Sequence, residues 1–105
     1  PLDRRHGRAE RVVTGHRVDV RGPAGTSPSV CIDVSTTGAR VGAVDGVAVG
    51  DRVELSGETG TWCPCVVKWV GSDEFGVEFV AAELSDKAVG RLRRLVADAK
   101  DRAAA

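Results

Sequence analysis

Short segments in which apolar and polar residues alternate cover most of the chain, and glycine-rich stretches separate them. Side chains of a β-strand point alternately to its two faces, so a two-residue period indicates strands with one buried face. Several short strands at close spacing, with few aromatic residues, are typical of a small antiparallel barrel. We therefore predict a mainly β fold with strands at residues 11–21, 29–35, 38–44, 52–55, 61–70 and 75–80.

The segments between these strands are rich in glycine, proline and small polar residues, which favour turns. One of them, Gly22–Pro28, is predicted to be a loop. Shorter turns are expected at Asp45-Gly46 and at residues 71–74, and Gly15 interrupts the first predicted strand.

Near the C-terminus the spacing of apolar residues becomes helical. Ser85 is expected to cap this helix, with the acidic Asp86 in its first turn. Arg91, Arg93 and Arg94 fall largely on the polar faces, where we expect them to be solvated. The chain is thus divided into an N-terminal arm (1–10), a β-barrel (11–82), a C-terminal helix (83–102) and a tail (103–105).

Composition and charge exclude several classes of function. The 105 residues, 42% of them hydrophobic, suffice for one domain with a modest core. The 15 basic and 15 acidic residues give a formal net charge of zero, which disfavours a general nucleic-acid binder. No apolar run is long enough to span a membrane, and no secretory signal is visible. The chain begins at Pro1 and contains no methionine, so we expect either a processed N-terminus or, in preference, a domain cut from a longer protein.

The cysteines and tryptophans are expected to serve packing. Cys63-Pro64-Cys65 lacks the C-x-x-C spacing of zinc and redox sites, so its thiols, like that of Cys31, are expected to be small buried apolar groups. Trp62 and Trp69 are seven residues apart. On an unbroken strand they would point to opposite faces, one of them toward the core.

Asp33, Ser35 and Gly38 form a D-x-S-x-x-G pattern at the end of a predicted strand. Alternation places the carboxylate and the hydroxyl on the same face, and the glycine lets the following turn bring backbone close to them. The pattern therefore indicates either a ligand site or a turn that these residue types shape, as they commonly do.

Arg4, Arg5 and Arg8 crowd the N-terminus. Alone, such a cluster is more often a solvated run of charge. Beside the D-x-S-x-x-G pattern it favours a compact site for an anionic ligand with a hydrogen-bonding edge. The guanidinium fork suits both a phosphodiester and the O6/N7 edge of guanine.

Together the two patterns resemble the PilZ domain, a bacterial receptor module for cyclic di-GMP. Its R-x-x-x-R motif is met by Arg4 and Arg8, and its D-x-S-x-x-G motif by Asp33, Ser35 and Gly38. The two motifs occur in the expected order and about one β-hairpin apart, and the resemblance covers nearly the whole sequence.

The resemblance implies a six-stranded antiparallel split barrel with a C-terminal helix, and cyclic di-GMP as the ligand without any cofactor. It implies that Arg4 and Arg8 lie on an arm that folds over ligand bound beside Asp33, Ser35 and Gly38. Arg5 either supplements this site or faces solvent. The resemblance also implies a module of the bacterial cytoplasm. It would pass arm closure to a neighbouring domain or a protein partner, without contacting nucleic acid or a membrane.

Two further positions bear on affinity and stoichiometry. Gly7 stands where family members often carry proline, which makes the free arm looser. Asp3 directly precedes the arginine motif, and an acid there should not favour a stacked pair of dianionic ligands.

Three other functions are disfavoured. A PilZ-fold interaction module that does not bind nucleotide is disfavoured because both motifs are intact. A small-barrel binder of single-stranded nucleic acid needs stacking platforms and a basic groove, but the chain has two tryptophans, two phenylalanines and no tyrosine. An enzyme is disfavoured because no nucleophile–base pair or metal cluster can be assembled from the sequence.

Overall fold

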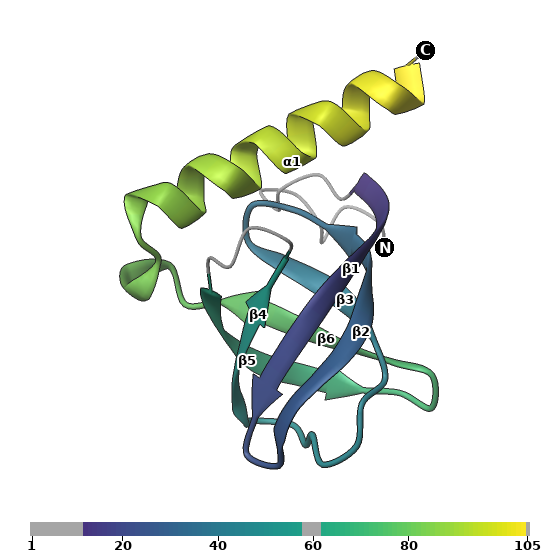
Figure 1. Cartoon of the computed structure of the whole chain (residues 1–105), viewed down its shortest axis with the longest axis vertical. Helices are drawn as coiled ribbons and strands as arrows, with labels where there is room; N and C mark the ends of the chain where they lie inside the picture. The colour runs from purple at the N-terminus through teal and green to yellow at the C-terminus, as the bar shows by residue number, and fades with distance from the viewer. Residues whose placement is uncertain (1–11, 58–61, 105) are drawn as a thin grey trace, which may run out of the picture.

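The computed structural model of the chain describes residues 12–57 and 62–104. Their strands close into an antiparallel barrel in the order β1-β2-β3-β6-β5-β4, and the helix α1 crosses one end of it (Figure 1). The prediction of a six-stranded antiparallel barrel with a C-terminal helix is therefore confirmed. The elements are β1 Val12–Gly22, β2 Gly25–Val34, β3 Gly38–Gly42, β4 Arg52–Ser56, β5 Trp62–Val70, β6 Glu74–Phe79, the 3-10 helix η2 Ala81–Glu83 and α1 Asp86–Ala104.

The predicted loop at Gly22–Pro28 is wrong, because β2 already begins at Gly25. Only Pro23 and Ala24 connect β1 to β2, and Gly25 adopts a positive φ of 116°. Pro28 lies within the strand opposite Asp19. The other edge of β2 pairs with β3 only from Cys31 onward, so the missing N–H of Pro28 falls where no strand lies beside that edge.

Both tryptophans lie outside the core, which corrects the expectation that one of them points inward. Trp62 is half-buried and Trp69 is exposed. The register of β5 on β6 shifts between Val67 and Trp69, so that Lys68 is an extra residue in β5. Such a bulge reverses the alternation of side chains, and it brings Trp69 to the outer face that Trp62 also occupies.

The barrel interior is filled mainly by β-branched and small side chains. Cys31 and Cys65 are buried, which confirms the prediction for these two thiols, whereas Cys63 is partly buried and packs against the core. Burial raises the pKa of the Cys63 and Cys65 thiols. The fully buried side chains with the largest volumes are Phe75, Val20, Val34, Val41, Val53, Val67 and Cys65.

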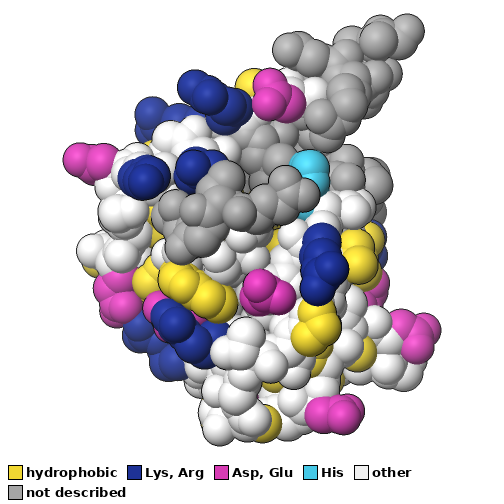
Figure 2. Space-filling model, in the orientation of Figure 1, with side chains coloured by type: hydrophobic (Ala, Val, Ile, Leu, Met, Phe, Trp, Pro, Cys, Tyr) yellow, Lys and Arg dark blue, Asp and Glu magenta, His cyan; other side chains and the backbone are white. Residues whose placement is uncertain are grey.

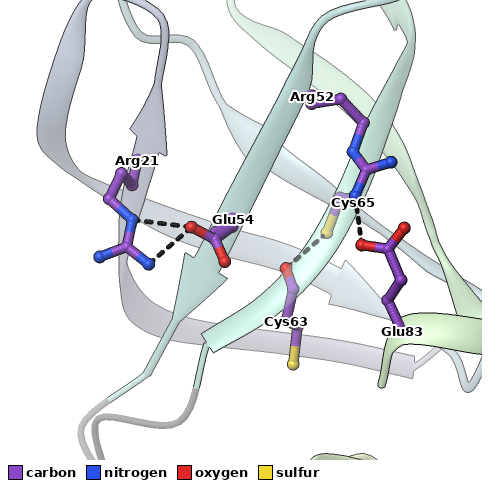
Figure 3. A network of polar contacts seen from close by, with 6 residues as sticks. All are labelled: Arg21, Arg52, Glu54, Cys63, Cys65 and Glu83. Carbon is purple, nitrogen blue, oxygen red and sulfur yellow. Dashed lines mark hydrogen bonds and ion pairs between the residues drawn. The ribbon is translucent and has the colours of Figure 1, made fainter. Parts of the chain in front are cut away.

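On the outer face of the barrel, one ion pair links β1 to β4 and another links β4 to η2 (Figure 3). Arg21 of β1 donates from Nε to Glu54 of β4 at 2.8 Å, and its guanidinium lies 4.0 Å from the ring centre of Trp62. Arg52 pairs with Glu83 of η2, which ties the segment before α1 to the barrel. In the same view the Cys65 thiol donates to the backbone oxygen of Cys63 at 3.1 Å.

The start of α1 matches the predicted cap. The Ser85 hydroxyl accepts a hydrogen bond from the backbone N–H of Ala88 at 3.0 Å, as an N-cap residue does. Ala88 and Leu92 are buried and Val96 packs against the core, so the helix covers the barrel end with one face. The helix begins at Asp86, later than the predicted residue 83, and it continues through residues 103 and 104 of the predicted tail.

The opposite face of α1 is basic. Lys87, Arg91, Arg93 and Arg94 are exposed, and Figure 2 shows basic side chains gathered over the first half of the helix. This agrees with the expectation that the helix arginines are solvated.

Two glycines with empty surroundings allow a test of backbone conformation alone. A Cβ atom added at Gly90 or at Gly15 would meet nothing within 4 Å, but Gly15 has a φ of +67° and Gly90 lies inside α1. We predict that Gly90→Ala raises the free energy of unfolding by about 0.5–1 kcal/mol, because alanine favours helix. Gly15→Ala should lower it by about 1 kcal/mol or more, because an L-residue is strained in that region. Urea unfolding of both variants measures the effects, and a shift of the same sign in the two would contradict the assignment.

Candidate functional site

The candidate site lies where β2 ends, at the end of the barrel that the β1–β2 hairpin does not occupy (Figure 1). The register of β2 on β3 shifts between Cys31 and Asp33, which makes Ile32 an extra residue in β2. Cys31 and Val34 both point into the core, opposite Val41 and Ala39, and Asp33 lies opposite Arg40. The bulge therefore turns Asp33 to the outer face, whereas unbroken alternation from Cys31 would direct its carboxylate into the core.

The Asp33 side chain is held by an arginine that sequence reasoning missed. Arg40 donates from Nη2 to Asp33 Oδ2 at 2.9 Å and from Nη1 to Glu74 Oε1 at 3.2 Å. Asp33 is only 6% exposed, so its charge needs a partner close by. The sequence places Arg40 two residues after Gly38 on the next strand, but its pairing with Asp33 depends on the register shift in β2.

Ser35 closes the turn that follows Asp33. Its backbone N–H donates to Gly38 O at 2.9 Å, and its hydroxyl accepts hydrogen bonds from the N–H groups of Thr37 at 3.1 Å and Gly38 at 3.2 Å. The side chain is 1% exposed. These contacts give the Ser35 hydroxyl the turn-shaping role that was one of the two predicted alternatives.

Gly38 is required by the approach of β6. An added Cβ atom would lie 2.4 Å from the backbone oxygen of Val77, and Gly38 pairs with Glu78 in the β3–β6 ladder. The backbone N–H of Phe79 also donates to Thr37 O at 2.8 Å, which ties the turn to β6. The space beside Gly38 is therefore taken by the backbone of β6.

A row of outward-facing positions crosses four strands from Asp33. Arg40 pairs with Gly76 of β6, and Gly76 pairs with Trp69 of β5. The indole of Trp69 lies over Gly76, since an added Cβ atom there would come within 2.1 Å of Trp69 Nε1. Because Gly76 has no side chain, the exposed indole of Trp69 can pack over β6. It lies two strands away from Arg40 on β3.

The three N-terminal arginines of the predicted site, Arg4, Arg5 and Arg8, lie outside the described residues. Of the predicted site, the structure thus brings together Asp33, Ser35 and Gly38 at one corner, and it adds Arg40 and Glu74 to them.

Comparison with known proteins agrees with this architecture. The family model of the PilZ domain matches residues 3–98, a range that includes both sequence motifs. The chain belongs to the PilZ domain family. No curated protein matches the sequence.

Two solved structures resemble this PilZ domain. The PlzA protein of Borreliella burgdorferi, crystallised in complex with c-di-GMP, matches with a TM-score of 0.69 at 12% identity, over 90% of this chain and 42% of that one. The inhibitor of motility MotI/DgrA of Bacillus subtilis matches with a TM-score of 0.54 at 19% identity, over 81% of this chain and 47% of that one. The PilZ domain thus spans less than half of either protein, and these likenesses support the fold.

Two features are absent from the described residues. No helix among them is long and apolar enough to cross a membrane. Within the same residues, no three or more His, Cys, Asp or Glu side chains are grouped as a metal ion would require.

The steric role of Gly38 is testable by substitution. We predict that Gly38→Ala lowers the free energy of unfolding by about 1–3 kcal/mol, because the new methyl group meets the rigid backbone of β6. Gly57→Ala is the matched control, since an added Cβ atom there meets nothing within 4 Å. Urea unfolding compares the two, and equal stability of both variants would show that β6 does not constrain Gly38.

Proposed function

We propose that this PilZ domain is a receptor module for cyclic di-GMP. The observation that carries the proposal is the Asp33 carboxylate, turned outward by a strand bulge and held by Arg40 at 2.9 Å beside the closed turn of the D-x-S-x-x-G motif. A carboxylate so placed accepts hydrogen bonds from the N1–H and the exocyclic amine of guanine. The resemblance to PlzA, which was crystallised with c-di-GMP, supports the choice of ligand.

The charges of the corner explain why the arm belongs to the proposed site. Asp33 and Glu74 flank one cation, Arg40, so these three groups together carry one negative charge. Cyclic di-GMP brings two negative phosphodiesters. Arg4, Arg5 and Arg8 supply the positive charge that the corner lacks, and their guanidinium groups suit both phosphate and the guanine O6/N7 edge.

The arm also provides the signal in this proposal. Fixing one backbone residue costs roughly 1–2 kcal/mol, so ordering five arm residues offsets much of the gross contact energy. The arm closes when nucleotide binds and opens when it leaves, which is an order–disorder switch. Ser35 and Gly38 fix the turn against which the ligand and the arm meet. An attached domain or a protein partner in the bacterial cytoplasm then senses the closed arm.

Titration calorimetry of the domain with cyclic di-GMP tests the proposal. We expect saturable binding that Arg8→Ala weakens about tenfold or more, since one good bidentate contact is worth about 1–3 kcal/mol. Arg93→Ala is the control, because this substitution removes the same charge from an exposed helix position outside both sequence motifs. The fitted stoichiometry distinguishes one nucleotide from a stacked pair. An intact domain that does not bind at sub-millimolar ligand would instead favour the interaction module.

The cost of ordering the arm gives a second test. We predict that Gly7→Pro tightens binding of cyclic di-GMP about two- to fivefold, because proline restricts the free arm by about 0.4–1 kcal/mol. The same calorimetric titration measures it. Unchanged or weaker affinity would contradict a pre-organised arm.

A further inference from the structure

We propose that Arg40 is the residue that positions Asp33 for guanine, and thereby a determinant of which cyclic dinucleotide the domain prefers. This inference rests on the proposed function, and it concerns a residue outside both sequence motifs.

The geometry fixes Arg40 at both ends of its guanidinium. Nη2 lies 2.9 Å from Asp33 Oδ2, and Nη1 lies 3.2 Å from Glu74 Oε1. The buried Nε atom of Arg40 has no hydrogen-bond partner among the described residues. Within that part of the chain, Nη1 and Nη2 therefore make the polar contacts of this side chain. A planar fork held between two carboxylates has little freedom to rotate, unlike a lysine ammonium.

The same contacts restrain the carboxylate of Asp33. The bulge sets the position of Asp33 on the strand. Its Oδ2 atom accepts from the Arg40 guanidinium, which also donates to Glu74 of β6. Each carboxylate oxygen has two acceptor positions, and the contact with Arg40 uses one of them at Oδ2. Arg40 therefore fixes the plane in which the carboxylate meets a base.

A fixed plane matters for guanine in particular. The N1–H and the 2-amino group of guanine are two donors in one plane, and a carboxylate satisfies both only when its two oxygens lie in that plane. Adenine has no donor at N1 and no 2-amino group, and hypoxanthine keeps the N1–H without the amine. The second hydrogen bond, to the 2-amino group, is therefore the one that depends most on the orientation that Arg40 imposes.

The experiment compares two ligands that differ only in this amine, cyclic di-GMP and the corresponding cyclic dinucleotide of inosine. Calorimetry gives the ratio of their dissociation constants for each protein. We expect the intact domain to prefer cyclic di-GMP about tenfold, the effect of one lost hydrogen bond to a charged acceptor. Arg40→Ala should reduce the ratio to about threefold or less, and Arg40→Lys should give an intermediate ratio, because lysine keeps the charge without the fork.

Arg21→Ala is the matched control. Arg21 is also a strand arginine with a cross-strand carboxylate partner, and its side chain is 46% exposed against 39% for Arg40. It lies beside the β1–β2 hairpin, at the other end of β2 from Asp33, so its removal should leave the ratio unchanged. Urea unfolding checks that each variant is folded, and Arg40→Lys carries the test where Arg40→Ala does not fold.

The outcomes separate the inference from the function on which it rests. Weaker binding of both ligands by the same factor in Arg40→Ala, with the ratio unchanged, would overturn the positioning role and indicate direct phosphate contact or a general structural effect. An unchanged ratio in Arg40→Lys, where that variant alone folds, would do the same. Failure of the intact domain to bind cyclic di-GMP would overturn the proposed function, and the inference with it.

Discussion

The bulge at Ile32 is the constraint on which the candidate site depends. It places one extra residue in β2 between Cys31, which belongs to the core, and Asp33, which does not. A one-residue shift moves every following side chain to the other face of a strand. Val34 consequently fills the barrel, and Asp33 meets Arg40 on the outside. Without the bulge the same sequence would direct a carboxylate among apolar side chains, where an unpaired charge is costly to bury.

The D-x-S-x-x-G motif combines two physical tasks in six residues. Asp33 offers a charged group, whereas the contacts of Ser35 and Gly38 are internal to the turn and to its junction with β6. The hydroxyl satisfies two backbone N–H groups that a four-residue turn would otherwise leave without partners, and the glycine admits the Val77 carbonyl. A motif of this kind is thus as much a condition for closing the barrel as it is a condition for holding a ligand.

Sequence patterns predicted the barrel, the helix with its Ser85 cap and the buried cysteines, because each depends on local alternation or capping. What they could not predict depends on register. The bulge at Lys68 brings Trp69 to the outer face of the barrel. The early start of β2 reflects its pairing with β1, which outweighs the tendency of Thr26, Ser27 and Pro28 to form turns. The arginine across from Asp33 likewise becomes visible only when strands are aligned. The roles of the N-terminal arginines stay predictions.

Charge balance links the proposed ligand to the proposed switch. The described half of the proposed site carries one net negative charge, from Asp33 and Glu74 against Arg40, so it does not attract a dianion by itself. In the proposed function it supplies hydrogen-bonding direction, and Arg4, Arg5 and Arg8 supply the positive charge. Under that proposal, nucleotide occupancy and the position of the arm change together, because neither half would bind well without the other. A chain with zero formal net charge can then respond to a dianion without attracting polyanions in general.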